Sequence, residues 1–133
     1  MKIAIIGPPT FQKKKKIKDL IFKVKKLYPE SKIITGGNKS GIEYEVKKNA
    51  LLFEMEYLEF NPSYTGHNLY SALNESYYGK GYHFTQELDR YRILVRHADK
   101  IIFGYEPLDP DWKKIYEPTL NYAKKLNKKV GFI

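Results

Sequence analysis

The sequence contains no cysteine, and this absence excludes disulfides and thiolate metal sites. Such a composition fits a reducing compartment. Arginine is scarce, because only Arg90, Arg92 and Arg96 occur among the 24 Lys and Arg residues. Lysine is a hydrated point charge that is poor at bidentate recognition. The net charge of +9 is therefore consistent either with anionic partners or with a surface that keeps the chain soluble.

No stretch of the sequence reaches the apolar length that spans a bilayer. The first residues, MKIAIIGPP, carry a short apolar run and then turn residues, without the longer apolar segment and cleavage site of a signal peptide. The basic segment that follows has a core-like apolar stripe and no Trp anchor, so we expect no membrane binding. We expect a cytoplasmic protein of one domain, since 133 residues is a usual domain size.

Five short apolar runs alternate with segments of helical periodicity. The runs predict strands at 2–6, 32–35, 55–60, 100–103 and 130–133. The segments between them predict helices at about 10–28, 40–53, 84–98 and 109–126. Thr10 is the expected cap of the first helix, and Ser40 with Glu43 forms a capping-box pattern at the second. This alternation indicates one α/β domain in three layers, with a five-stranded, mainly parallel sheet and helices on both faces.

The stretch at about 61–82 is an aromatic-rich insertion with several turn residues. A connection this long is uncommon in a compact domain unless it is functional or partly helical, and we expect a short helix at 69–73. Tyr78, Tyr82 and His83 are candidates for stacking on a base. Tyrosines also fill cores and interfaces, and His83 equally fits a plain polar residue.

Three of the expected strands end in glycine, at Gly7, at Gly36-Gly37 and at Gly104. In an open parallel sheet the carboxyl ends of the strands form the ligand crevice. The turn 36–41 leads into a helix N-terminus, where free amides and the helix dipole favour an anion. A tight turn that needs glycine for its geometry alone is the alternative. The expected ligand and phosphate contacts are Gly7, Pro8, Gly36, Gly37, Asn38, Lys39, Ser40, Gly41, Glu43, Arg90 and Gly104.

These residues also carry a resemblance to a known family. The stretch Gly36–Glu43 resembles the GGxxGxD turn of the SMF/DprA–LOG (SLOG) superfamily, in its YspA-like branch. Tyr78–Lys80 resembles the aromatic-x-Gly-Lys segment of that branch. Arg90–Asp99 resembles its "RN…AD" helix, which leads into a strand like Lys100–Phe103. The opening strand with its turn at Gly7 also fits, and the similarity covers most of the chain in the right order.

The resemblance implies a Rossmann-like SLOG domain over residues 1–133 that binds a nucleotide or nucleotide-derived ligand, in a protein that is a possible homo-oligomer. Ser40 is an extra residue in the first turn, Glu43 stands where the family usually has Asp, and Tyr91 replaces Asn. LOG enzymes cleave a nucleotide N-glycosidic bond with a Gly-Thr turn after the fourth strand, where this chain has Gly104-Tyr105-Glu106-Pro107. This departure favours a sensing or sequestering module over a LOG-type enzyme.

Two glutamates are candidates for catalysis if the protein is an enzyme. The segment 109–130 is similar to the ending of nucleoside deoxyribosyltransferases, which use a Glu nucleophile, and Glu117 lies within it. A carboxylate that attacks an anomeric carbon gives a covalent glycosyl intermediate. Glu106 is the second candidate. A solvated or helix-capping carboxylate is the alternative for Glu117.

Arg90 and the three histidines are the remaining candidates for ligand or metal binding. Arg90 lies off the apolar stripe of its helix, where its planar fork suits either a ligand phosphate or an ion pair with Glu87. The three histidines are scattered, so we expect no metal site and no cofactor.

A third hypothesis is single-stranded nucleic-acid binding, as in the DprA branch, through the run Lys13–Lys16 and the tyrosines. A solvated helix face is the alternative for that run.

Overall fold

All five expected strands form in the computed structural model, which describes residues 1–133. They are β1 (Lys2–Ile6), β2 (Lys32–Thr35), β3 (Glu56–Glu59), β4 (Lys100–Phe103) and β5 (Lys129–Phe132). Their order in the sheet is β3-β2-β1-β4-β5, and every pairing is parallel. The expected parallel sheet is confirmed and carries no antiparallel strand. The strand order reverses between β1 and β4, the switch point of the sheet.

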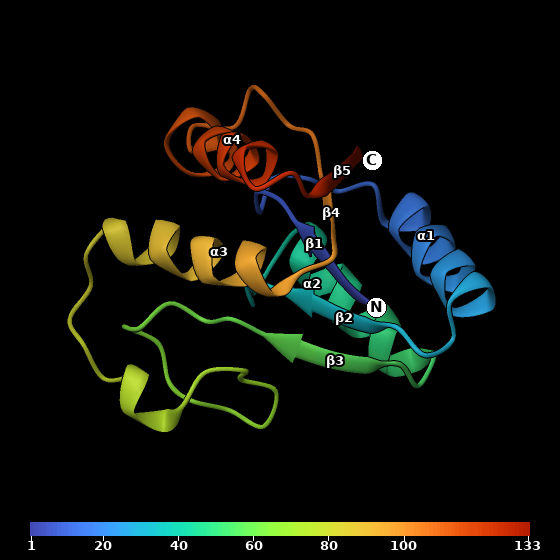
Figure 1. Ribbon diagram of the computed structural model, residues 1–133, viewed down its shortest axis with the longest axis horizontal. Coiled ribbons are helices and arrows are strands. Elements are labelled where there is room, and N and C mark those ends of the chain that lie inside the picture. The colour runs from blue at the N-terminus through green and yellow to red at the C-terminus, as the bar shows by residue number, and fades with distance from the viewer.

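Four helices cover the two faces of this sheet in three layers (Figure 1). They are α1 (Lys14–Leu27), α2 (Ile42–Leu52), α3 (Thr85–His97) and α4 (Glu117–Lys125). Two apolar clusters fill the spaces between the layers. One lies beneath α1 and α2, with Ile17, Ile21 and Val46. The other lies beneath α3 and α4, with Leu94, Val95 and Ala123.

Local capping patterns placed the starts of the first two helices wrongly. α1 begins at Lys14, and the Thr10 hydroxyl donates to the Asp109 carboxylate instead of capping the helix. α2 begins after Gly41, whose φ of 77° is in the left-handed region, and no side chain caps it. Ser40 is exposed, whereas Glu43 is fully buried. Long-range contacts of Glu43 therefore outweigh the local capping box.

The long segment at 61–82 also differs from its expectation. Residues 69–73 form no helix, and a short 3₁₀ helix occurs later, at Glu75–Tyr77. Ser71 instead bridges to Glu59 beside β3, where the Glu59 amide donates to the Tyr70 carbonyl at 2.8 Å. The segment therefore lies along an edge of the sheet, a pairing that no local pattern encodes.

The C-terminal third shows one further shift. Helical structure begins at Trp112 rather than at Asp109, as a π-helix (Trp112–Tyr116) that continues directly into α4. No helix has both the length and the apolar composition needed to cross a bilayer. No group of three His, Asp or Glu side chains is placed to hold a metal ion.

Candidate functional site

Protein atoms fill the switch point between β1 and β4. A Cβ atom on Gly7 would lie 2.7 Å from the Ile42 side chain, and one on Gly104 would lie 2.8 Å from it. A Cβ atom on Gly41 would lie 2.5 Å from the backbone of Pro9. These distances are too short for any larger residue. The three glycines therefore let the turns after β1 and β4 pack directly against the start of α2.

Glu43 ties the turn after β2 to the turn after β1. Its carboxylate accepts hydrogen bonds from the amides of Gly7 and Asn38, each at 3.2 Å, and from the Tyr91 hydroxyl. The residue is completely buried. Burial raises the pKa of the Glu43 carboxyl, while the charge of Arg90 and the hydrogen bond from Tyr91 oppose the rise. Its acceptor atoms point into the protein.

Arg90 lies behind the turn at 36–41 and is 2% exposed. Its guanidinium donates to the Gly36 carbonyl, to the Asn38 side-chain oxygen at 2.9 Å and to the Tyr91 hydroxyl at 3.3 Å. The ion pair with Glu87 that the sequence left open does not form; the half-buried Glu87 accepts a hydrogen bond from the Tyr64 hydroxyl instead. Arg90 therefore supports the turn from below, and Nε is left as a buried donor without a partner.

A cavity of about 590 Å³ opens beside this turn, at the carboxyl ends of β2 and β3. The turn, α2 and the residues after β3 enclose it. Its size falls in the usual range for small-molecule sites, and most of its lining residues are polar or charged. The lining residues include Gly37, Asn38, Lys39, Tyr44, Lys47, Lys48, Glu59, Asn61, His67 and Asn68. Three lysines and one carboxylate thus face a single space.

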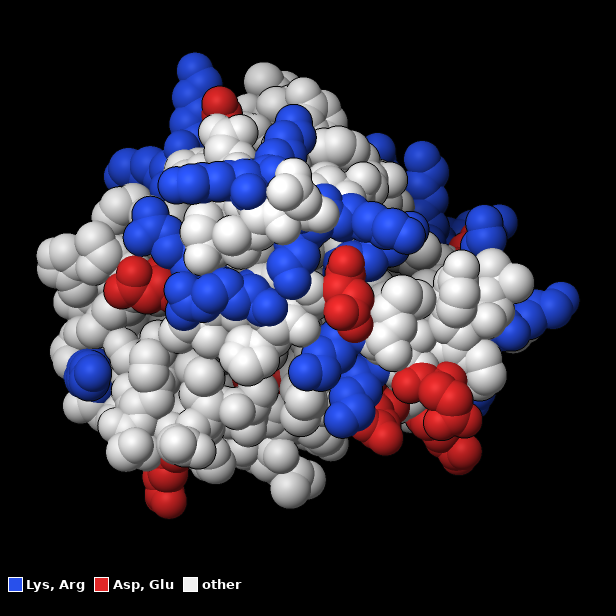
Figure 2. All heavy atoms as spheres, viewed as in Figure 1, with Lys and Arg blue, Asp and Glu red and all other residues white.

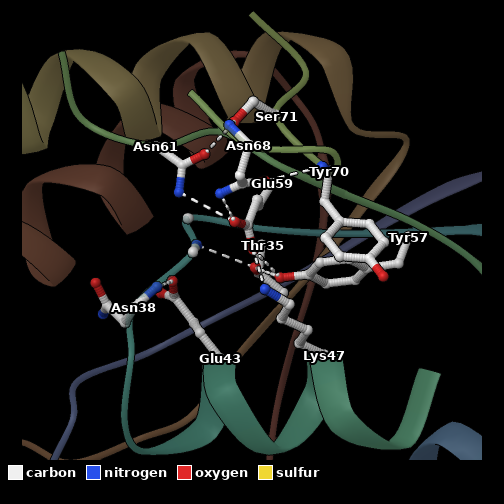
Figure 3. Close-up of polar contacts among 12 residues, drawn as sticks. Thr35, Asn38, Glu43, Lys47, Tyr57, Glu59, Asn61, Asn68, Tyr70 and Ser71 are labelled. Atoms are coloured by element: carbon white, nitrogen blue, oxygen red, sulfur yellow. Dashed lines mark hydrogen bonds and ion pairs between the residues drawn. The ribbon is translucent and has the colours of Figure 1, made fainter. Parts of the chain in front are cut away.

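Glu59 is the one acidic residue in this wall, and it is 2% exposed. Its carboxylate accepts hydrogen bonds from the Tyr57 hydroxyl at 2.7 Å, from Asn68 at 2.7 Å and from Asn61 at 3.3 Å (Figure 3). Burial by itself raises the pKa of Glu59. The three hydrogen bonds and the charge of Lys47 outweigh it, so the net shift of the pKa is downward. The site therefore keeps Glu59 ionised.

Lys47 reaches the same wall from the middle of α2. Its ammonium nitrogen lies 3.5 Å from Glu59 Oε2 and 4.9 Å from the centre of the Tyr70 ring (Figure 3). The Lys47 side chain is 34% exposed, so part of it faces the cavity. Lys39 and Lys48 are exposed and form no ion pair. The cavity therefore offers two free cations and one that is partly neutralised.

Unpaired backbone donors lie next to these cations. The amides of Lys39, Ser40 and Gly41 donate to no protein acceptor, although the preceding amides of Gly37 and Asn38 do. They precede the first turn of α2, where the helix dipole is positive. An anion bound beside Lys39 would therefore meet both free N–H groups and favourable charge.

Positive charge alone would not have identified this cavity. Figure 2 shows Lys and Arg side chains gathered over α3, α4 and the nearby strand starts. The cavity lies against α2, on the other side of the sheet (Figure 1). The lysines of Lys13–Lys16 are also exposed. The cavity is therefore defined by enclosure and by its unpaired donors, since cations occur over much of the surface.

The candidates for base stacking and for catalysis do not line the cavity. Tyr78 packs edge-on against His67 with ring centres 5.3 Å apart, and so lies behind the cavity wall. Tyr82 is exposed and packs on Tyr64, and His83 is exposed at the start of α3, where it contacts Thr85. The catalytic candidates, Glu106 and Glu117, do not line the cavity.

Most residues of the site were not expected from the sequence, among them Lys47, Lys48, Glu59, Asn61 and Asn68. One signal was present, because Tyr57 and Glu59 alternate on the face of β3 that packs towards α2. A strand that directs a carboxylate towards a covered face indicates a partner or a ligand. The asparagines meet Glu59 only through the fold of the segment after β3.

The strand order and the crevice at the carboxyl edge define a Rossmann-like α/β domain. No protein-family model and no curated protein sequence matches the chain. Solved structures share its fold. The molybdenum cofactor binding protein of Rippkaea orientalis has a TM-score of 0.68 and 19% identity, over 98% of this chain and 74% of that one.

Two further structures are similar over 98% of this chain. DNA processing protein A (DprA) of Streptococcus pneumoniae has a TM-score of 0.75 and 16% identity, and this chain spans 49% of its length. The molybdenum cofactor carrier protein of Chlamydomonas reinhardtii has a TM-score of 0.62 and 15% identity, with 75% of its length covered. These similarities show the same fold as the expected Rossmann-like domain.

Proposed function

We propose that this protein binds a nucleotide or nucleotide-derived ligand in the cavity beside the turn at 36–41, as a sensing or sequestering module of SLOG type. The observation that carries the proposal is the convergence of Lys39 and Lys48 on one cavity, beside a turn whose amides at 39–41 donate to no protein acceptor. These groups suit a phosphate, since they combine positive charge with directed N–H donors. The motifs at Gly36–Glu43, Tyr78–Lys80 and Arg90–Asp99 resemble those of the YspA-like branch, and on that ground we propose that the protein belongs to this branch.

The far wall of the cavity suits the rest of such a ligand. Glu59, Asn61 and Asn68 offer an acceptor and amide groups, and Tyr44 and His67 offer ring surfaces. A ligand with a phosphate at one end and a hydroxylated or heteroaromatic part at the other would satisfy both walls. Two of the similar structures are described as proteins that bind or carry molybdenum cofactor, a nucleotide-like ligand, which supports the same class.

A thermal-shift titration tests the proposal. The panel contains nucleosides, nucleoside mono- and diphosphates, dinucleotides, ADP-ribose, cyclic nucleotides and inorganic phosphate. A ligand that binds the native state raises the melting temperature by mass action. We expect a shift for phosphorylated ligands and none for the corresponding nucleosides at equal concentration.

The matched variants replace exposed lysines. Lys39→Gln with Lys48→Gln removes the free cations of the cavity and should weaken binding by about tenfold or more, which is about 1.4 kcal/mol. Lys18→Gln, on the exposed face of α1, is the control and should bind as the wild type does. Gly37 is a poor site for a test, since its φ is +77° and a Cβ atom would lie 2.3 Å from the Asn61 amide. If no ligand shifts the melting temperature, or if the double variant retains the full shift, the proposal is wrong.

A further inference from the structure

The carboxylate of Glu59 has one acceptor position that the protein leaves open. An ionised carboxylate accepts about four hydrogen bonds. Asn61 and Asn68 occupy Oε1, whereas Oε2 receives one hydrogen bond, from Tyr57. The neighbour on the other side of Oε2 is the Lys47 ammonium at 3.5 Å, which is too far for a hydrogen bond of ordinary length.

This open position lies at the cavity. Lys47 and Glu59 both line it, and Figure 3 shows Lys47 rising from α2 towards Glu59 while the asparagines approach from the opposite side. A group that bridges Oε2 and the ammonium from the cavity side must donate to the first and accept from the second, because a separation of 3.5 Å leaves no room for an atom directly between them. A phosphate oxygen cannot donate, and an ammonium cannot accept. A hydroxyl group can do both.

We propose that Glu59 and Lys47 together recognise a sugar hydroxyl of the ligand, so that the site selects ribose-containing over deoxyribose-containing nucleotides. The inference rests on the proposed function and identifies the ligand class within it. In this arrangement the phosphate lies at Lys39, Lys48 and the amides of 39–41, and the sugar lies against β3. A ligand that lacks the hydroxyl leaves the carboxylate and the ammonium short of a partner while the rest of the ligand fills the cavity around them.

The test measures calorimetric affinity for three ligands that differ by one oxygen atom: a ribonucleoside 5′-monophosphate and its 2′-deoxy and 3′-deoxy analogues. For the wild type we expect at least one deoxy analogue to bind about tenfold more weakly than the ribonucleotide. In Glu59→Gln the ribonucleotide should lose about tenfold in affinity, whereas the sensitive deoxy analogue should lose little. Discrimination between the two ligands should therefore nearly disappear.

Tyr57→Phe is the matched structural control. It removes a neighbouring donor to Oε2 and perturbs the same cluster, yet it leaves the carboxylate and Lys47 in place. It should retain the wild-type ratio of affinities for ribo- and deoxyribonucleotide, and circular dichroism shows whether each variant is folded. If Tyr57→Phe loses discrimination as Glu59→Gln does, the effect is structural and the inference is wrong.

The remaining outcomes separate the two proposals. If ribo- and deoxyribonucleotides bind the wild type equally, the hydroxyl inference fails while nucleotide binding at the cavity stands. If Glu59→Gln weakens all three ligands by the same factor, Glu59 supports the cavity without reading the sugar, and the inference fails again. If no nucleotide binds, both proposals fall together.

Discussion

Two glutamates lie at the carboxyl edge of the sheet, in different surroundings. Glu43 supports the turns of the fold, whereas Glu59 belongs to the wall of the candidate site. Glu43 is 0% exposed and Glu59 is 2% exposed, so both are removed from water to a similar degree. Glu43 lies at the start of α2 between two turns, and its hydrogen-bond partners come from the protein core. Glu59 lies at the end of β3 in the wall of a cavity, with one acceptor position free.

The pKa values of the two carboxyls move in opposite directions because burial and hydrogen bonding are balanced differently at each. Burial disfavours the charged form in both. At Glu43 burial is the stronger effect despite the nearby Arg90, and the pKa is raised. At Glu59 hydrogen bonds from Tyr57, Asn68 and Asn61 outweigh it, and the pKa is lowered. A buried carboxylate that the protein keeps ionised beside an open cavity is the better functional candidate.

Glu43→Gln should have the largest effect on stability. The amide has one oxygen where the carboxylate has two, so its NH₂ group would face the N–H of Gly7 or of Asn38. The buried guanidinium of Arg90 would also lose the favourable charge of Glu43. We expect a loss of about 3–5 kcal/mol in the free energy of unfolding, measured by urea denaturation at pH 7.

Glu45→Gln is the matched control for this prediction. Glu45 lies two residues further along α2, where it makes a 3.9 Å ion pair with an exposed lysine. Its replacement should cost less than about 0.5 kcal/mol. A loss under 1 kcal/mol for Glu43→Gln would mean that the turns at 7 and 38 do not depend on this carboxylate.

Glu59→Gln should cost less at neutral pH, about 2 kcal/mol, because the cavity lets water approach the altered group. Its pH dependence is the sharper test. The folded-state pKa of Glu59 is below the ordinary value of 4.5, so its contribution is present above that value and is lost as the pH falls through the folded-state pKa. The stability difference between wild type and variant should therefore shrink below about pH 4.5. A difference that stays constant from pH 7 to pH 3 would contradict the lowered pKa.

Tyr57→Phe should destabilise the protein by about 1 kcal/mol, since it removes hydroxyl contacts to Glu59 at 2.7 Å and Thr35 at 2.8 Å without changing the ring. It also removes a cause of the lowered pKa of Glu59. Acid unfolding should therefore begin at a higher pH than in the wild type, as followed by circular dichroism. Tyr44→Phe, on the exposed side of α2, should leave the acid transition unchanged.

The sequence predicted the sheet well because its signals are local. Each strand is an apolar run, and the run at Lys2–Ile6 stops at a glycine that the packing requires. The helix starts failed where side chains act over long distances. Glu43 binds the amide of Gly7, 36 residues away, and so does not cap its own helix as the Ser40–Glu43 pattern predicted.

One wall of the candidate site was predictable because its signal in the sequence is local. Gly37, Asn38 and Lys39 follow from the turn between a strand and a helix, and all three line the cavity. The opposite wall combines Lys47 from α2 with Glu59 from β3 and a loop beyond it, and only the tertiary fold brings these groups together. The alternation of Tyr57 and Glu59 along β3 was the one sequence signal for this wall, and no pattern predicted the partners that Glu59 meets there.

Lys47→Gln should show the smallest effect on stability and still separate the two glutamates. The Lys47 side chain is 34% exposed and its contact with Glu59 is 3.5 Å long, so the loss should be about 0.5 kcal/mol or less in urea denaturation. The same change removes one of the causes that lower the pKa of Glu59 and none that acts on Glu43. NMR titration of the two carboxyl groups should show a rise in the pKa of Glu59 alone. An equal rise at both would mean that the two carboxylates belong to one electrostatic network, and the division between support and site would not hold.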